Sequence, residues 1–331
     1  MTFAARKRLY AQIEQQRQSR VIGFVTGDRQ NLETAISADC IDLFVELLDK
    51  IGPTERISLV LHTNGGSTLA AWRIVNLIRT FCDELEVLIP SKALSAGTLI
   101  SIGADRIVMT KQAALGPIDP SVNNPLNPQT VIGNQQMRVP VSVESVLGFL
   151  DAARQELGLT TEGSLAGVLM NLSSQVHPLV LGEIFRARAQ IRFLAGKLIT
   201  RQVTEALKIE SIIKFLCADS GSHDYTLNRR EARELGLNIE NPSPEFYGQL
   251  KKVHDSYRTQ LALLEPYSPQ VLIGAQMAAP YTHVRGLVES RAGSYGFVSE
   301  GTLTKAMMPG PMGPQEAITD QRTFEGWKKL S

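Results

Sequence analysis

Cysteine is scarce in this chain. Its 331 residues include three cysteines, Cys40, Cys82 and Cys217, which stand far apart. None belongs to a CxxC pair or to the Cys/His spacing that zinc sites use, so we predict no metal site. An odd number of isolated thiols is typical of a protein kept in a reducing compartment.

Long apolar runs and a charge excess are also lacking. No run of 18 or more apolar residues is present, so we expect no membrane span. The first residues lack the apolar core of a secretory signal, and a cytoplasmic protein is therefore expected. The net charge of +1 creates no overall field that would attract nucleic acid or an anionic membrane, and neither is expected as a partner.

Nucleotide-binding motifs are the third absence. The sequence contains neither GxGxxG nor GxxxxGK[ST], so we expect no cofactor, and any unfolding ATPase would be a separate partner. What is present is ordinary for a soluble globular protein: 43% hydrophobic and 20% charged residues. The length allows one large domain or two modest ones.

Apolar runs alternate with helical patterns through the first third of the chain. Strands are predicted at 21–25, 57–61, 85–89 and 106–110, and helices at 38–51, 68–80 and 96–104. This alternation predicts an α/β fold with a parallel sheet. The turns that follow successive strands then meet at the carboxyl edge of the sheet, where sites in such folds form.

Ser95 stands at one of these turns, between the predicted strand 85–89 and the predicted helix 96–104. The unpaired N–H groups at the start of a helix suit a nucleophilic serine and its oxyanion. By itself, the pattern fits a helix-capping serine better. The preceding turn shifts the interpretation toward function, because the N–H groups of Gly65 and Gly66 can face Ser95 there.

Seven segments, in order and spacing, resemble the Clp-fold serine peptidases, which include the Clp proteolytic subunit and signal peptide peptidase A. The segments are 62–66, 93–100, 103–109, 115–120, 176–179, 222–225 and 231–237. The branch that the chain resembles best is the serine dehydrogenase proteinase (SDH) family. The resemblance covers roughly residues 20–240 and implies a ClpP/crotonase-like fold of repeated ββα units with a parallel sheet.

The resemblance also implies a division of the chain. We expect an N-terminal helical arm over 1–20, a peptidase domain over 21–240, and a helical C-terminal extension over 241–331 that serves assembly. A hairpin is predicted at 295–304. Homo-oligomers are common in the superfamily, so we expect one here.

The activity implied by the resemblance is that of a serine endopeptidase, which cleaves peptide or protein substrates through an acyl-enzyme. Ser95 would be the nucleophile, and the N–H groups of Gly66 and Ala96 would form the oxyanion hole. Gly65 would allow close approach of the substrate backbone, and Asn64 would line the substrate pocket.

The general base is the difficult part of this assignment. The base histidine of the Clp subunit aligns near Pro117, where this chain has no histidine. Related Ser–Lys enzymes place their lysine in a stretch that is empty here, between Lys111 and Lys197. We therefore favour His177 as the base, with His223 or a lysine as the alternative.

Asp224 falls on the position of the aspartate that orients the base in the Clp subunit. Helix capping is the competing interpretation for both Asp224 and His177. Two other functions stay open: a crotonase-fold acyl-CoA enzyme, and a non-catalytic assembly protein. Crotonases use glutamates near the oxyanion turns, and none stands beside Gly65 and Gly66.

Overall fold

The computed structural model describes the chain except residues 1, 119–120, 123, 133–134, 220–223 and 311–312. The chain divides into two compact units, one formed by Met1–Leu115 with Leu227–Ser331 and the other by Gly116–Thr226. These units do not coincide with the predicted ranges 1–20, 21–240 and 241–331. The chain passes out of the first unit and returns to it, so its N-terminal and C-terminal parts share one body.

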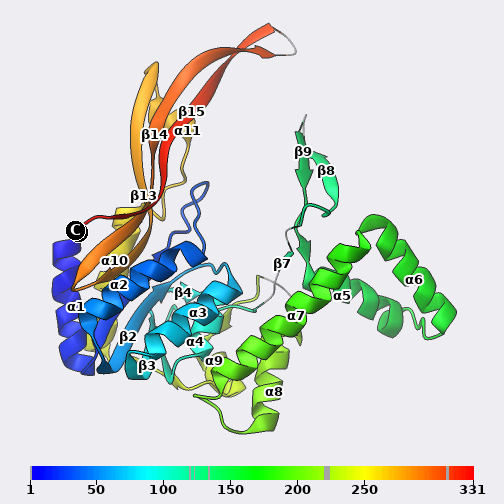
Figure 1. The fold of residues 1–331 in the computed structure, drawn as a ribbon, viewed down its shortest axis with the longest axis horizontal. Helices are drawn as coiled ribbons and strands as arrows, with labels where there is room; N and C mark the ends of the chain where they lie inside the picture. The colour runs from blue at the N-terminus through cyan, green and yellow to red at the C-terminus, as the bar shows by residue number, and fades with distance from the viewer. Residues whose placement is uncertain (1, 119–120, 123, 133–134, 220–223, 311–312) are drawn as a thin grey trace. The chain divides into compact units, whose positions relative to one another are not determined.

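An eight-stranded mixed sheet forms the centre of the first unit, in the order β12-β5-β3-β2-β1-β13-β14-β15 (Figure 1). The parallel part consists of β1 (Arg20–Thr26), β2 (Thr54–His62), β3 (Cys82–Ile89), β5 (Arg106–Met109) and β12 (Ile239–Glu240). The antiparallel part consists of β13 (Ala278–Ser290), β14 (Gly293–Gly310) and β15 (Gly313–Lys329). The predicted α/β class and the predicted strands are confirmed.

Helices cover both faces of the parallel strands, which explains why these strands are continuously apolar. On one face lie α2 (Ile41–Ile51), α3 (Thr68–Arg79) and α4 (Ala96–Ile102), each in contact with the next. On the other face lie α1 (Phe3–Arg17) and α10 (Pro244–Leu261), and Val21, Val25, Val60, Leu88 and Val108 pack against them.

The first helix is an integral part of this unit and not a peripheral arm. The Arg6 side chain is fully buried, and its Nε donates to Glu289 Oε2 of β13 at 2.9 Å. The hydroxyl of Tyr10 donates to the same carboxylate at 3.0 Å and is also hydrogen-bonded to the hydroxyl of Tyr257 on α10. A buried polar network thus joins α1, α10 and β13.

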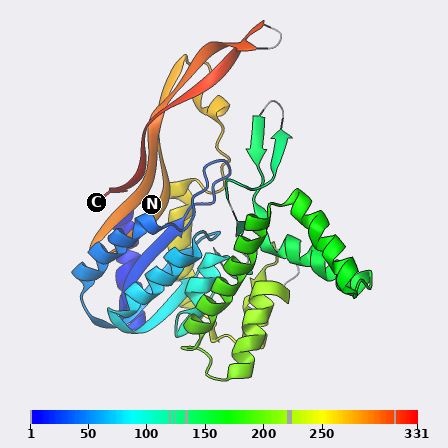
Figure 2. The same ribbon diagram turned by 45° about the vertical axis from the view of Figure 1, so that its right-hand side comes forward.

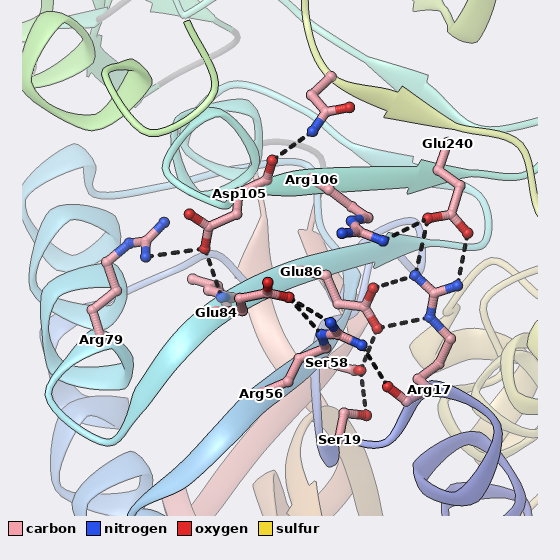
Figure 3. Close-up of polar contacts among 12 residues, drawn as sticks. Arg17, Ser19, Arg56, Ser58, Arg79, Glu84, Glu86, Asp105, Arg106 and Glu240 are labelled. Atoms are coloured by element: carbon pink, nitrogen blue, oxygen red, sulfur yellow. Dashed lines mark hydrogen bonds and ion pairs between the residues drawn. The ribbon is translucent and has the colours of Figure 1, made fainter. Parts of the chain in front are cut away.

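A second network joins α1 to four residues of the parallel strands (Figure 3). Arg17 binds Glu86 of β3, with Nε 3.1 Å from Oε1, and Glu240 of β12, with Nη1 2.7 Å from Oε1. Ser58 of β2 donates to Glu86 at 2.6 Å, and Arg106 of β5 lies 3.3 Å from Glu240. These contacts lie away from the carboxyl edge that carries Ser95.

The prediction of a helical C-terminal extension is right only for its first part. After α10 and the short α11 (Pro269–Ile273), three long antiparallel strands extend the main sheet. Buried Ala279 and Tyr281 alternate with exposed Pro280 and Thr282, which is the period of a strand. The predicted hairpin at 295–304 is one segment of β14, paired with both β13 and β15.

Figures 1 and 2 show β14 and β15 as a long twisted ribbon that continues beyond the end of β13. The pairing gives the same result, because β14 pairs with β13 only as far as Thr304, whereas it pairs with β15 as far as Gly310.

The second unit is mainly helical. Its helices are α5 (Val143–Asp151), α6 (Glu162–Gln175), α7 (Pro178–Ile199) and α8 (Ala206–Lys214). Its strands are β7 (Ser121–Val122), β8 (Gln129–Ile132), β9 (Gln135–Arg138) and β10 (Val141–Ser142). Across the described ranges of both units, no helix combines the length and the apolar character needed to cross a membrane.

Candidate active site

Two turns lie side by side at the carboxyl edge of the parallel strands. One follows β2 and leads into α3, and the other follows β3 through β4 (Lys92–Ala93) into α4. The N–H of Thr63 donates to the carbonyl of Lys92 at 3.2 Å, and the N–H of Leu94 donates to the carbonyl of Thr63 at 3.0 Å. The backbone itself therefore joins the glycine turn to the serine turn.

Gly65 packs directly against Ser95. A Cβ atom added to Gly65 would lie 2.7 Å from the Cβ of Ser95 and 3.2 Å from the nitrogen of Ala96, which is closer than ordinary contact. The φ of Gly65 is also +116°, a backbone conformation that favours glycine. A residue with a side chain at position 65 would push the serine turn away.

Gly66 is fixed by a bridge to the segment before α2. The N–H of Ile36 donates to the carbonyl of Gly65, and the N–H of Ser67 donates to the carbonyl of Ile36, both at 2.8 Å. In a parallel bridge of this kind, the N–H of the central residue points away from the partner. In the part of the chain that the structure describes, the N–H groups of Gly66 and Ala96 donate no hydrogen bond.

Ser95 has a strained backbone. Its φ is +51° and its ψ is −113°, as expected for the first central residue of a type II′ turn, a position that glycine usually occupies. The N–H of Gly97 closes this turn by donating to the carbonyl of Leu94 at 2.8 Å. Strand, tight turn and helix in this order present a serine side chain at a sheet edge.

The Ser95 hydroxyl is not used for helix capping. Ser95 precedes α4, but its side chain accepts no capping hydrogen bond, whereas Ser67 accepts the N–H of Ala70 at 3.2 Å at the start of α3. Ser95 is half-buried, and its Oγ has no hydrogen bond to any residue that the structure describes. The capping interpretation of this side chain is therefore wrong.

Asp28, which sequence reasoning missed, lies beside these turns. It follows the end of β1, and its Oδ1 lies 3.2 Å from Nε2 of buried His62, while its Oδ2 is paired with the ammonium of Lys92. Burial alone would favour the neutral acid. The hydrogen bonds from His62 and Lys92 outweigh burial and hold the pKa of Asp28 well below its usual range.

A second histidine extends this cluster from α10. The ring of His254 lies 5.1 Å from the ring of His62, measured between centroids. Burial, followed by electrostatic interaction with His62 and Arg258, lowers the pKa of His254 to about 4. No group of three or more metal-ligating side chains suited to an ion occurs among the described residues.

His177 and Asp224 belong to the second unit, and their predicted roles stay predictions. His177 is exposed and caps α7: its Nδ1 accepts the N–H of Leu179 at 3.2 Å. Asp224 is exposed in a turn near the end of that unit, and the alternative base His223 lies outside the described residues. Asn64, in the first unit, is exposed next to Gly65.

Residues 1–145 match a family described as ClpP-like SDH-type serine proteinases. Two curated relatives are uncharacterized proteins of Methanocaldococcus jannaschii. MJ0137 is 27% identical over 222 residues, which is 66% of each chain. MJ1495 is 25% identical over 258 residues, or 75% of this chain and 76% of the relative.

Two solved structures are more distant. A ClpP1 mutant from Listeria monocytogenes is 15% identical, with a TM-score of 0.38 over 71% of this chain and 99% of the other. A mutant of the membrane-bound stomatin-specific protease 1510-N, in complex with a substrate peptide, is 16% identical. Its TM-score is 0.35 over 67% of this chain and 94% of the other.

Proposed function

We propose that this chain, whose residues 1–145 match the ClpP-like SDH-type serine proteinases, is a serine endopeptidase with Ser95 as its nucleophile. The observation that carries the proposal is the state of Ser95. Its backbone is held in a strained turn against Gly65, and its hydroxyl is not engaged by the fold. Strain of this kind costs about 1–3 kcal/mol and concentrates at functional sites.

In the proposed reaction, Ser95 Oγ attacks the carbonyl carbon of a peptide bond while a base takes its proton. The negative oxygen of the tetrahedral intermediate accepts hydrogen bonds from the N–H groups of Gly66 and Ala96. Loss of one such donor typically costs about 3–4 kcal/mol of transition-state stabilisation. The amine then leaves with a proton, and water releases the acyl group from Ser95.

The substrate would lie as an added strand along Asn64–Gly66. The neighbouring bridge to Ile36 supports this placement, since it uses the groups of Gly65 and Ser67 and leaves the N–H of Gly66 directed to the opposite side. Main-chain pairing of this type binds peptides with little regard to sequence. A peptide or protein is therefore the proposed substrate.

The proposed base is His177, oriented by Asp224. In its capping state, the neutral ring accepts at Nδ1 and so carries its proton on Nε2. To act as a base at Nε2 with an aspartate at Nδ1, the ring must release Leu179 and change tautomer. A homo-oligomer, an assembly role for residues 241–331, a separate ATPase partner and a cytoplasmic location complete the proposal.

Intact-mass analysis after incubation with a fluorophosphonate tests the nucleophile. We expect one adduct on the wild type and on Ser91→Ala, a matched serine in the same loop, and none on Ser95→Ala. His177→Ala should also lose the adduct if this histidine is the base. An adduct lost only in Ser95→Ala would move the base to His223 or a lysine.

The absence of any adduct on the wild type would refute the peptidase proposal. It would favour one of the two alternatives, a crotonase-fold acyl-CoA enzyme or a non-catalytic assembly protein. Binding of acyl-CoA, measured by calorimetry on the same preparation, would then distinguish these two.

A further inference from the structure

One carboxylate connects the ends of three neighbouring strands at the candidate site. Asp28 follows β1, and its two oxygens are bound by different partners: His62 at the end of β2, and Lys92 in β4, just after β3. The side chains of Asp28 and His62 are 17% and 3% exposed, so water screens their contact only weakly.

The two partners occupy equivalent positions in their turns. His62 stands three residues before Gly65, and Lys92 stands three residues before Ser95. The backbone bonds between Thr63 and the segment from Lys92 to Leu94 run between the same two turns. Asp28 thus adds a side-chain link to the backbone link between the glycine turn and the serine turn. Both links involve residues that come just before Gly65 and Ser95 in the sequence.

We propose that Asp28 is a positioning residue whose carboxylate, by binding His62 and Lys92 together, holds the glycine turn at a fixed distance from Ser95. The residue touches no substrate and acts through its two partners. This inference rests on the proposed peptidase function for its kinetic consequence, although the structural link itself does not depend on that function.

Asp28→Asn removes the charge and retains the shape. The amide can accept from only one of the two donors, so one turn loses its connection to the other. A displacement of reacting groups on the order of 1 Å costs roughly 100-fold in rate. We expect the maximal rate of Ser95 phosphonylation by a fluorophosphonate, in which the serine oxygen bonds to phosphorus and fluoride leaves, to fall about 10- to 100-fold, with little change in the concentration that gives half-maximal rate.

A matched control removes a carboxylate from the other part of the same sheet. Glu84 of β3 accepts from Arg56 of β2 at 2.7 Å, so Glu84→Gln also breaks a link between neighbouring parallel strands (Figure 3). The control should keep the wild-type rate of phosphonylation. Asp28→Glu retains the charge and should recover part of the lost rate. If general destabilisation caused the loss, the labelling rates would instead follow the unfolding temperatures of the variants.

Hydrogen exchange provides a readout that does not need activity. Amides in 63–66 and in 92–97 should exchange faster together in Asp28→Asn and keep their wild-type rates in Glu84→Gln. If Asp28→Asn does not fold, Lys92→Met and His62→Gln each remove one of the two links and should give the same change.

The outcomes separate this inference from the proposed function. Wild-type hydrogen exchange in both segments, or an unchanged rate of phosphonylation, in Asp28→Asn would overturn the positioning role. A wild type without a Ser95 adduct, combined with faster exchange in the variant, would instead refute the peptidase function and leave the link between the turns established.

Discussion

The contact between Gly65 and Ser95 gives the sharpest prediction for the site. Replacing Gly65 by alanine places a Cβ 2.7 Å from the Cβ of Ser95 and 3.2 Å from the nitrogen of Ala96. Neither neighbour is the flexible end of a side chain, so the serine turn must move. The new residue must also adopt a φ of +116°, which L-residues avoid.

The magnitude follows from the size of the overlap. Relief of a 2.7 Å contact requires a displacement of most of an ångström, and a misplacement on the order of 1 Å costs roughly 100-fold in rate. The same displacement moves Ala96, a proposed oxyanion donor, and loss of one donor alone costs about 100- to 1,000-fold. We expect Gly65→Ala to lower the rate of Ser95 phosphonylation by a fluorophosphonate at least about 100-fold.

The assay is the second-order rate of fluorophosphonate labelling, followed by intact mass, with thermal unfolding measured on the same samples. Gly52→Ala is the matched control. Gly52 has a φ of +71°, so alanine is strained there as well, but a Cβ at Gly52 would meet no atom within 4 Å. Both variants should lose stability by about 1–3 kcal/mol, and only Gly65→Ala should lose reactivity.

A Gly65→Ala protein that is labelled within threefold of the wild-type rate would refute this reasoning. The result would mean that the turn tolerates the displacement, or that Ser95 and Gly65 do not work together. Equal losses in Gly65→Ala and Gly52→Ala would show that general destabilisation, and not the local contact, controls the reactivity.

Three further predictions concern the strain and the buried charges. The free energy of unfolding in urea titrations should be about 1 kcal/mol higher for Ser95→Gly than for Ser95→Ala, because only glycine adopts the positive φ of the turn without strain. Glu289→Gln should destabilise by about 3–5 kcal/mol in urea titrations, because Arg6 is fully buried, while exposed Glu84→Gln should cost less than about 1 kcal/mol. The native protein keeps His254 neutral down to a pKa of about 4, whereas the unfolded chain protonates near 6.5, so stability should fall as the pH drops through this window. His254→Gln should remove about 2 kcal/mol of the difference between pH 7 and pH 5 in the same titrations.

The parallel part of the sheet could be predicted from the sequence because its signal is local. Strands buried on both faces are short, wholly apolar runs, and 57–61 and 85–89 are such runs. The C-terminal strands were not predicted because their alternation of buried and exposed residues is interrupted. β13 carries a bulge between Val284 and Gly286, and much of β14 and β15 pairs outside any core.

The first helix shows a different limit. Its start, with Arg6 among other basic residues, has the composition of a solvated surface. The partner that makes burial of Arg6 tolerable is Glu289, which lies 283 residues away in the chain. No periodicity within the helix indicates that partner, so the integration of α1 into the core depends on a contact that only the fold reveals.

The same distinction runs through the site. The positions of Gly65, Gly66 and Ser95 could be predicted because turn chemistry is encoded at each turn. Asp28 could not, since its role depends on two donors from other strands. The available hint was its place directly after a strand, at the edge where Ser95 and Gly65 were already expected.

The arrangement of donors around Asp28 also bears on the search for the base. His62 and Lys92 are the basic side chains of the first unit that stand closest in sequence before the two turns, and both direct their polar hydrogens at Asp28. An ammonium that donates to a carboxylate has no acceptor atom of its own, so Lys92 is poorly placed to take a proton from Ser95. A histidine that donates to a carboxylate at one ring nitrogen can still accept a proton at the other, and Nδ1 of His62 is buried without a hydrogen-bond partner among the described residues. The first unit would thus supply the proposed nucleophile Ser95 and the N–H groups of Gly66 and Ala96, with Lys92 serving to fix the position of the serine turn. His177→Ala is the variant that tests the proposed base.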